Sequence, residues 1–155
     1  MIPAATLRAA EAHLRAVDPQ LAPLIDRHGP CTIGRRRRDP FHVLCHSIIG
    51  QQLSIKAADT IAARVAAATG AGARFAPVHF LTADHDRLRA CGLSNAKARW
   101  LRALAEARHE GRLDFAKLKK LDDEAAIDAL DALPGIGRWT AEMFLIFALD
   151  RLDIF

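Results

Sequence analysis

The sequence predicts an all-α fold, and three observations support this prediction. Alanine and leucine dominate the chain, β-branched residues are sparse and tyrosine is absent. Apolar residues recur at helical spacing, as at Leu7, Ala10, Leu14 and Val17. No segment alternates between apolar and polar residues as a half-buried strand does. With 155 residues, 51% of them hydrophobic, the chain is long enough to form one sizeable core.

The first part of the chain contains two expected helices and a basic loop. The periodic pattern predicts a helix over 6–17, ended by Asp18 and Pro19, and a short helix over 21–25. Four consecutive arginines, at 35–38, then follow in a loop. This run is either a solvated group of charges or an arm that contacts phosphates, and the sequence leaves both interpretations open.

The remaining helices are marked by expected capping residues. Asp39, Ser54, Ser94 and Asp122 each stand where a side-chain oxygen can accept a first-turn N–H. The pattern predicts helices over 40–50, 54–68, 84–90, 94–111, 115–119, 122–130 and 138–149. The segment from Pro77 to Leu81 is predicted as loop. Altogether we expect about nine or ten helices with short connections in a single domain over 1–155.

Composition excludes several classes of protein and favours none strongly. The net charge of +4 weakly favours a polyanionic partner. The cysteines, Cys31, Cys45 and Cys91, form no CxxC pair, so a zinc or iron–sulfur site has little support. We expect them to be free, buried thiols in a reducing cytoplasm. No secretory signal and no apolar run long enough to cross a bilayer is evident, so no membrane partner is expected.

The segment 133–141, Leu-Pro-Gly-Ile-Gly-Arg-Trp-Thr-Ala, is the most informative part of the chain. It predicts two helices joined by a tight hairpin, because two glycines two residues apart permit turns with positive φ. The amides of Gly135, Gly137 and Arg138 then lie near a helix N-terminus, which favours a DNA phosphate. A plain turn between helices is the alternative, but the full string between apolar helices favours nucleic-acid binding. We include Thr140 among the backbone-binding residues, although its pattern also fits a buried helical position.

Trp139 follows the hairpin in the first turn of the next helix. For an arbitrary tryptophan, packing in the core is the ordinary role. Beside a phosphate-binding hairpin, the alternative is an aromatic wall that stacks on an extruded base.

Three segments together resemble one family. The string at 133–141 resembles the helix-hairpin-helix (HhH-GPD) DNA glycosylase superfamily, in particular its 3-methyladenine DNA glycosylase II branch. Asp39-Pro40-Phe41 followed by Ser-Ile-Ile-Gly-Gln-Gln-Leu-Ser at 47–54 is similar to a second segment of that branch, and Gly92-Leu93-Ser94 with Lys97-Ala98 to a third. The resemblance runs from about Leu7 to Phe155 in the expected order.

The resemblance implies a fold and an activity. The fold is two-lobed and all-α, with an interlobe cleft bordered by the hairpin. The implied activity is base excision repair: removal of alkylated purines such as 3-methyladenine from double-stranded DNA, by base flipping and hydrolysis of the N-glycosidic bond. Trp139 would line the base pocket, where cation–π attraction suits a cationic base. Lyase members carry a Schiff-base lysine at this position, so Trp139 indicates a monofunctional glycosylase.

The resemblance also implies a wedge and a cation site. Gln52, or in second place Leu53, would fill the gap left by the flipped base, although glutamines here also fit a role as ordinary helix-end caps. No cofactor is expected, and the cysteine cluster of the family's iron–sulfur branch has no counterpart in this sequence. A structural monovalent cation would be held by the backbone carbonyls of Leu133 and Ile136.

The resemblance breaks at the end of the chain. The catalytic aspartate of the family is expected just after Phe155, so we assign no catalytic residue in this chain and expect the C-terminal part of the fold to be missing. Asp150 and Asp153 do not match the catalytic position. The 155-residue chain is therefore expected to be weak or inactive, and a complete protein to be a monomer at the nucleoid of a bacterial-type cytoplasm.

Two other functions stay open from the sequence. One is a non-catalytic helix-hairpin-helix module that only binds the DNA backbone. The other is an all-α interaction protein whose basic residues serve solubility. Trp139 and the Gln51-Gln52-Leu53 link argue against a simple backbone clamp, which needs neither.

Overall fold

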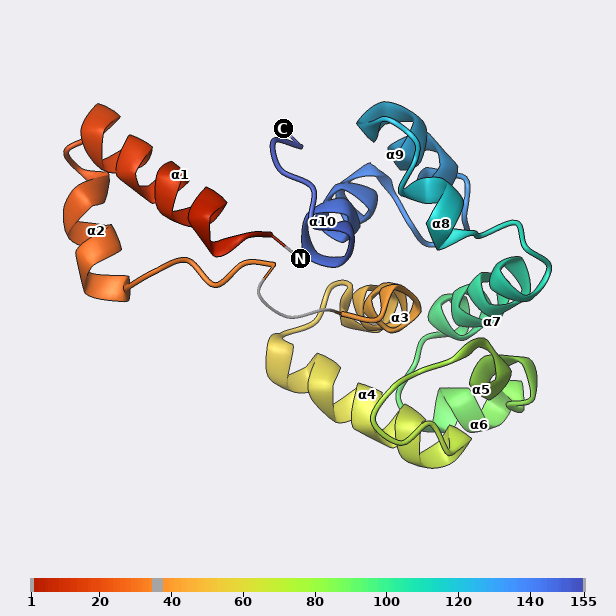
Figure 1. Cartoon of the computed structure of the whole chain (residues 1–155). Coiled ribbons are helices and arrows are strands. Elements are labelled where there is room, and N and C mark those ends of the chain that lie inside the picture. The colour runs from red at the N-terminus through yellow and green to blue at the C-terminus, as the bar shows by residue number, and fades with distance from the viewer. Residues whose placement is uncertain (1, 35–37, 155) are drawn as a thin grey trace. The chain divides into compact units, whose positions relative to one another are not determined.

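The computed structural model describes residues 2–34 and 38–154, and every regular element in these residues is a helix (Figure 1). This confirms the all-α prediction for the described part of the chain. The helices are α1 Ala4–Val17, α2 Leu21–His28, α3 Pro40–Gly50, α4 Ile55–Thr69, α5 Pro77–Leu81, α6 His85–Ala90, α7 Asn95–His109, α8 Phe115–Leu118, α9 Asp123–Asp131 and α10 Arg138–Leu149.

The chain divides into two compact units, Met1–Arg37 and Arg38–Phe155. In the first unit, α1 packs against α2. An ion pair between Arg15 and Asp26, at 2.6 Å, joins these two helices. The carboxylate of Glu11 also accepts the backbone N–H of Cys31. Of the four arginines at 35–38, the first three lie outside the described residues.

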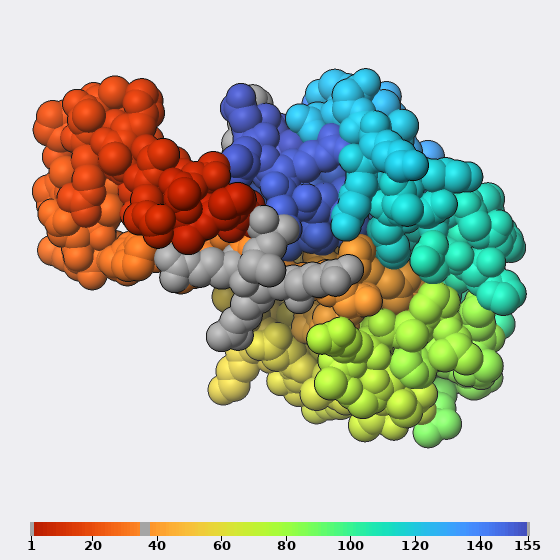
Figure 2. Space-filling view, viewed as in Figure 1, coloured from red at the N-terminus to blue at the C-terminus, as the bar shows by residue number. Residues whose placement is uncertain are grey.

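The second unit is built around α3. This helix contacts α4, α7 and α10, and in Figure 2 it contributes only a small orange patch between the blue atoms of α10 and the yellow to green atoms that follow α3. Its Leu44, Ile48 and Ile49 are fully buried, as are Leu101 of α7 and Leu145 of α10. Burial of each such side chain contributes about 1.5–3 kcal/mol to the stability of the fold, and this shared core holds α3, α7 and α10 together.

The four predicted N-caps are confirmed. Asp39 accepts the N–H of His42 at 2.9 Å and Ser54 that of Ala57 at 3.3 Å. Ser94 accepts the N–H of Lys97 at 3.2 Å, and Asp122 that of Ala125 at 2.8 Å. Each such cap contributes about 1 kcal/mol, so the starts of α3, α4, α7 and α9 are set by local sequence.

The prediction of loop over 77–81 is wrong, because the structure has helix α5 there. Pro77 occupies the first helical position, which suits its fixed φ. The imidazole of His79 accepts the N–H of Ala76 at 2.9 Å, a cap that the side-chain pattern did not suggest. Phe80 is fully buried, so packing against the core stabilises this short helix.

The cysteines are free, but only two of them are buried. Cys45 and Cys91 are buried, and burial raises the pKa of the Cys45 thiol well above its ordinary value. Cys31 is exposed, so the prediction of buried thiols is wrong for this residue. It lies in the loop after α2, which ends before Gly29 and Pro30, so no helix turns Cys31 toward a core. None of the helices in the described part is long and apolar enough to span a membrane.

Candidate nucleic-acid interface

The hairpin between α9 and α10 is a tight turn over residues 133–136. The N–H of Ile136 donates to the carbonyl of Leu133 at 3.1 Å, with Pro134 second in the turn. Gly135 is third, with φ +83°. This is the pattern of a type II turn, in which the third residue needs positive φ and proline suits the second position. Leu133 and Ile136 are buried, at 8% and 3% exposure, so they anchor the turn to the core.

Gly135 is required for a second reason. A Cβ atom built on it would lie 2.4 Å from Cδ2 of Trp100, and the neighbouring ring atoms are almost as close. The indole of Trp100, on α7, therefore packs flat against the backbone of the hairpin. Any side chain at position 135 would displace either this indole or the turn.

The other side of the hairpin leaves a helix N-terminus open. Gly137 is the N-cap of α10 and, having no side chain, makes no side-chain hydrogen bond to the first turn. Gly137, Arg138 and Trp139 are all exposed. By contrast, α3, α4, α6, α7, α8 and α9 each begin with a capping Asp or Ser side chain. The first amides of α10 are thus available to an anion from outside the chain.

A second tight turn links α3 to α4. The N–H of Leu53 donates to the carbonyl of Gly50 at 3.1 Å. Gln51 has φ −51° and ψ 131°, and Gln52 has φ +58°. These are the angles of a type II turn, but Gln52 occupies the place that glycine prefers. A non-glycine residue in this conformation is strained by about 1–2 kcal/mol, and such strain gathers at functional sites. The side chains of Gln52 and Leu53 are both exposed.

The two turns are hydrogen-bonded to each other. The side-chain amide of Gln51 donates to the carbonyl of Gly135 at 2.7 Å. The ammonium of Lys97, from the first turn of α7, donates to the carbonyls of Ile49 at 2.8 Å and Gln51 at 2.6 Å. The exposed Gln52–Leu53 segment is therefore held directly beside the hairpin.

Residues 45–141 match the family model described as HhH-GPD superfamily base excision DNA repair protein. This region contains both turns and the start of α10. The chain belongs to this superfamily. A relative, DNA-3-methyladenine glycosylase 1 of Schizosaccharomyces pombe, is 33% identical over 153 residues, which cover 96% of this chain and 67% of the relative. This relation places the chain in the 3-methyladenine DNA glycosylase family.

Solved structures agree with this membership. A 3-methyladenine DNA glycosylase of S. pombe in complex with abasic DNA has a TM-score of 0.84 at 33% identity, covering 95% of this chain and 73% of that one. A DNA-3-methyladenine glycosidase from Bacillus halodurans has a TM-score of 0.78 at 39% identity, covering 90% and 64%. DNA-3-methyladenine glycosylase 2 of Escherichia coli is 33% identical over 125 residues, which cover 76% of this chain and 44% of the relative.

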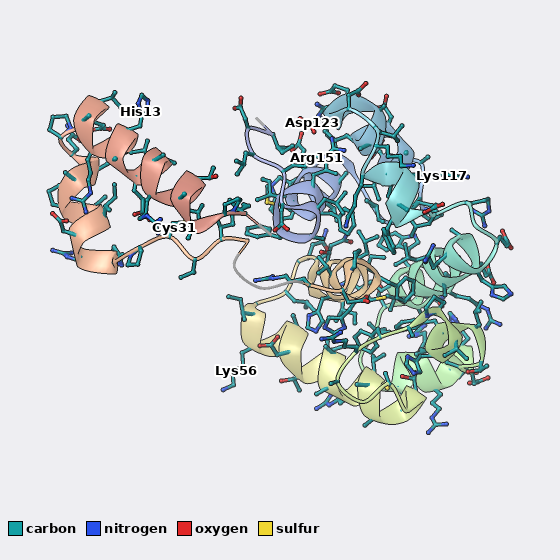
Figure 3. All side chains as sticks on the ribbon, viewed as in Figure 1. His13, Cys31, Lys56, Lys117, Asp123 and Arg151 are labelled. Atoms are coloured by element: carbon teal, nitrogen blue, oxygen red, sulfur yellow. The ribbon has the colours of Figure 1, made fainter. Side chains whose placement is uncertain are left out.

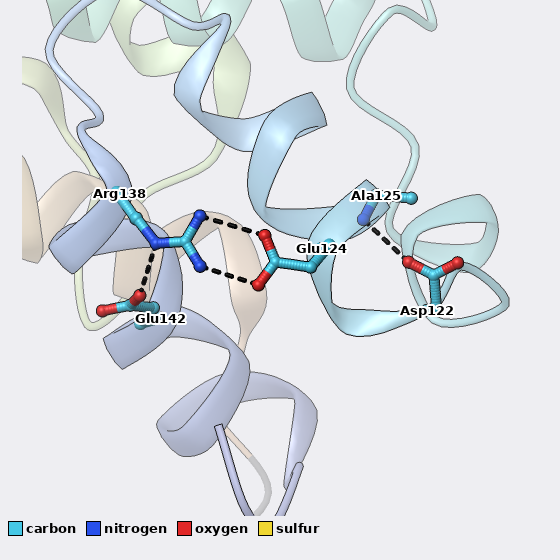
Figure 4. Close-up of polar contacts among 5 residues, drawn as sticks. All are labelled: Asp122, Glu124, Ala125, Arg138 and Glu142. Carbon is cyan, nitrogen blue, oxygen red and sulfur yellow. Dashed lines mark hydrogen bonds and ion pairs between the residues drawn. The ribbon is translucent and has the colours of Figure 1, made fainter. Parts of the chain in front are cut away.

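In this HhH-GPD protein, the side chain of Arg138 is engaged by two carboxylates (Figure 4). Its guanidinium makes two hydrogen bonds to Glu124 of α9, at 3.0 and 2.7 Å, and one to Glu142 at 3.0 Å. These contacts raise the pKa of Arg138 and lower that of Glu124. The guanidinium of Arg138 is therefore already paired, so binding any other anion would require it to release a carboxylate.

Trp139 and Thr140 point to opposite environments. Trp139 is 69% exposed, although its indole is large and apolar, whereas Thr140 is 7% exposed. Ala141, Phe144 and Leu145 bury the opposite face of α10 in the core. Consecutive helical residues diverge by about 100°, so anchoring these three presents Trp139 outward. A contact of Thr140 with the DNA backbone, and the cation at Leu133 and Ile136, stay predictions.

The segment after α10 is held to the rest of its unit by Arg151. Asp150 ends α10 in the left-handed conformation, with φ +60°. The next residue, Arg151, pairs with Asp123, and the two side chains lie together in Figure 3. The same guanidinium donates to the carbonyls of Leu118 and Leu121, at 3.1 and 2.6 Å. This network ties the segment after α10 to the α8–α9 connection.

The sequence missed the roles of Gln51, Lys97 and Trp100. Lys97 was part of a recognised segment but carried no assigned role, and Trp100 was not linked to the hairpin. No local signal indicates these contacts, because the partners are 84 residues apart in the case of Gln51 and Gly135. Within the described residues, no group of three or more His, Cys, Asp or Glu side chains is placed to hold a metal ion.

Proposed function

We propose that this chain carries the DNA-binding and base-flipping machinery of a glycosylase that removes alkylated purines, such as 3-methyladenine, from double-stranded DNA. The single observation that supports this most is the exposed Trp139 directly after an uncapped, glycine-led helix N-terminus. The relatives are named as 3-methyladenine DNA glycosylases, and one is solved with abasic DNA. The fold that we infer for the whole protein is two-lobed, with a cleft bordered by the hairpin.

The hairpin grips one DNA strand by its backbone. The first amides of α10, from Gly137 onward, donate to a phosphate, and the positive end of the helix dipole favours this anion. Such contacts fix the position of the enzyme without reading sequence. A monovalent cation at the carbonyls of Leu133 and Ile136 would bridge the hairpin to the same strand. The Leu133 carbonyl accepts the N–H of Ile136 with one lone pair, and its second lone pair would coordinate the cation.

Trp139 receives the flipped base. An alkylated purine is cationic, and its attraction to an indole face contributes about 0.5–2 kcal/mol. Normal purines lack this charge, so the same stacking discriminates against them. The exposed indole needs no rearrangement of the core to reach a base, because α10 is anchored on its opposite face.

Gln52 fills the gap that the flipped base leaves, with Leu53 beside it. Both side chains are exposed at the tip of a tight turn. The left-handed backbone of Gln52 supports this role, because a strained conformation at the tip has no evident benefit for folding. A polar plug of this kind also offers hydrogen bonds to the unpaired base on the opposite strand.

The chemical step is hydrolysis with no covalent enzyme intermediate. Trp139 stands where lyase members carry a lysine, and an indole forms no imine. A single carboxylate would stabilise the oxocarbenium-like sugar. With double-stranded DNA as its substrate, the protein would act at the genome, which we propose is the nucleoid of a bacterial-type cytoplasm.

A binding assay with 7-methylguanine, an alkylated purine that carries a positive charge, tests this function. The affinities of the chain for an undamaged duplex and for the same duplex with one 7-methylguanine, protected from base loss by a 2′-fluoro sugar, are compared by fluorescence anisotropy of a dye-labelled strand. We expect a preference for the lesion that Trp139→Ala lowers about two- to thirtyfold, from the cation–π range, and that Trp139→Phe largely retains. Both variants should bind undamaged duplex as the parent does.

Salt dependence and base release complete the test. Affinity for undamaged duplex should fall linearly with salt on logarithmic axes, with a slope of about −0.9 per phosphate contact. A chain with no lesion preference would be a backbone clamp and not a glycosylase module. A preference that Trp139→Ala leaves unchanged would refute the role of Trp139 as the base-receiving wall. Release of 3-methyladenine from methylated DNA by these 155 residues would show that the catalytic carboxylate lies within them.

A further inference from the structure

Three segments that are distant in sequence meet at the Gly135 turn. The turn after α3 contributes the side chain of Gln51, which donates to the carbonyl of Gly135 at 2.7 Å. The N-terminal half of α7 contributes Lys97, which holds the backbone of Gln51, and Trp100, which packs against Gly135. Lys97 and Trp100 are three residues apart, so they lie on one face of α7. This face is a common platform for both turns.

The contact between Gln51 and Gly135 is specific to an amide donor. Gln51 is partly buried, and its side chain spans from one turn to the other with a single hydrogen bond to backbone. A glutamate at this position would set an anionic oxygen against a carbonyl, and a leucine would leave the carbonyl unpaired. The ammonium of Lys97 adds a charge-assisted bond at each of two carbonyls at the C-terminal end of α3, where a cation is favourable. Burial lowers the pKa of this ammonium, which agrees with its enclosed position.

We propose that Gln51 is a positioning residue that couples the phosphate grip of the hairpin to insertion of the wedge. The inference deepens the proposed function and rests on it. Gln52, the proposed wedge, is covalently next to Gln51, while Gly135 lies within the phosphate-binding turn. The hydrogen bond thus fixes how far the wedge stands from the gripped strand. Gln51 itself touches no DNA; it acts through Gln52.

Such coupling matters because insertion tolerates little error. A functional group misplaced by about 1 Å loses much of its effect even when every contact residue is present. Without the Gln51 amide, the Gly50–Leu53 turn would keep its own hydrogen bond but lose its link to the hairpin. Backbone binding would persist, whereas stabilisation of the flipped state would weaken.

The experiment compares two duplexes in the full chain. One is undamaged; the other carries tetrahydrofuran, an abasic-site analogue, with 2-aminopurine opposite, whose fluorescence reports the local stacking. Gln51→Leu should bind undamaged duplex within about twofold of the parent but lose up to about tenfold in preference for the tetrahydrofuran duplex, the range for one hydrogen bond. Gln51→Glu, which retains the shape of the side chain, should show the same loss. Thr69→Val is the matched control, because it removes one side-chain-to-backbone bond, at 2.8 Å, far along α4.

A double-mutant cycle separates coupling from a purely structural role. If Gln51 acts through the wedge, Gln51→Leu should cost little further preference once Gln52→Ala is present. Additive losses, or equal losses for both duplexes, would overturn the proposal. If the parent chain itself shows no preference for the tetrahydrofuran duplex, the proposed function fails. If the parent shows the preference and both Gln51 variants retain it, the coupling alone fails.

Discussion

Gly135→Ala is the sharpest test of the hairpin geometry. The new methyl group would lie 2.4 Å from Cδ2 and 2.6 Å from Cε3 of Trp100, so the indole or the turn must move. Overpacking of this kind costs about 1–3 kcal/mol. The φ of +83° at residue 135 adds about 1–2 kcal/mol for a residue with a Cβ atom. The two effects together predict a loss of about 2–5 kcal/mol in the free energy of unfolding.

Urea denaturation, followed by the far-ultraviolet circular dichroism of the helices, measures this loss. In thermal melts it corresponds to a decrease of about 4–20 °C for a chain of this size. Gly137→Ala is the matched control, because residue 137 has φ −94° and its nearest neighbour for a Cβ atom is Oδ1 of Asp131 at 3.9 Å. Alanine is a poorer N-cap than glycine, so a loss of no more than about 1 kcal/mol is expected there.

The clash and the backbone strain are separable. Trp100→Leu gives the methyl group of Gly135→Ala room, so the double variant should lose less than the sum of the single losses, while the cost of positive φ remains. Ordinary surface substitutions change the free energy of unfolding by no more than about 0.5 kcal/mol. If Gly135→Ala changes it by no more than this, then the indole does not pack against residue 135 as described. Equal losses for the two glycine variants would refute the reasoning as well.

Three further predictions concern the loop and the charges. Gln52→Gly should raise the free energy of unfolding by about 0.5 kcal/mol, because glycine relieves the strain of the positive φ, and should lower the preference for damaged DNA. Thermal melting measures the first effect and anisotropy the second, and Gln52→Ala, which keeps the strain, is the control for the stability gain. Glu124→Gln should strengthen duplex binding about two- to threefold at low salt by freeing Arg138 for phosphate; unchanged affinity would exclude this role. Asp114 has a pKa lowered mainly by backbone N–H donors, so its carboxylate stabilises the fold above its ordinary pKa of 3.8. Urea denaturation should therefore show a lower free energy of unfolding for Asp114→Asn than for the parent at neutral pH. The difference should vanish at a pH well below 3.8, where the carboxyl of Asp114 is protonated.

Local rules predicted the helices well. Asp39, Ser54, Ser94 and Asp122 each cap the helix that they were expected to cap. The failure at 77–81 has a tertiary cause, because burial of Phe80 stabilises a helix too short to form alone. Cys31 shows the reverse limit: a residue type that is usually buried is exposed, and composition carries no information about its neighbours.

The candidate site was predictable where the chemistry is carried by adjacent residues. Gly135, Gly137 and Trp139 stand within one short string, and the string alone indicated a turn, an open helix N-terminus and an aromatic beside it. The ion pair between Arg138 and Glu124 was not predictable from the string. Glu124 comes from another helix, and its approach depends on how α9 packs against α10.

By itself the sequence determined the helices other than α5, both tight turns and the family, because caps, turn residues and short motifs are properties of neighbouring residues. Only the tertiary structure decided that the turn after α3 meets the hairpin before α10. The Gln51 amide and the Gly135 carbonyl are 84 residues apart and come together on the face of α7 that carries Lys97 and Trp100. That meeting depends on the packing of α3, α7 and α10 around one core, and a pattern read along the chain does not contain it.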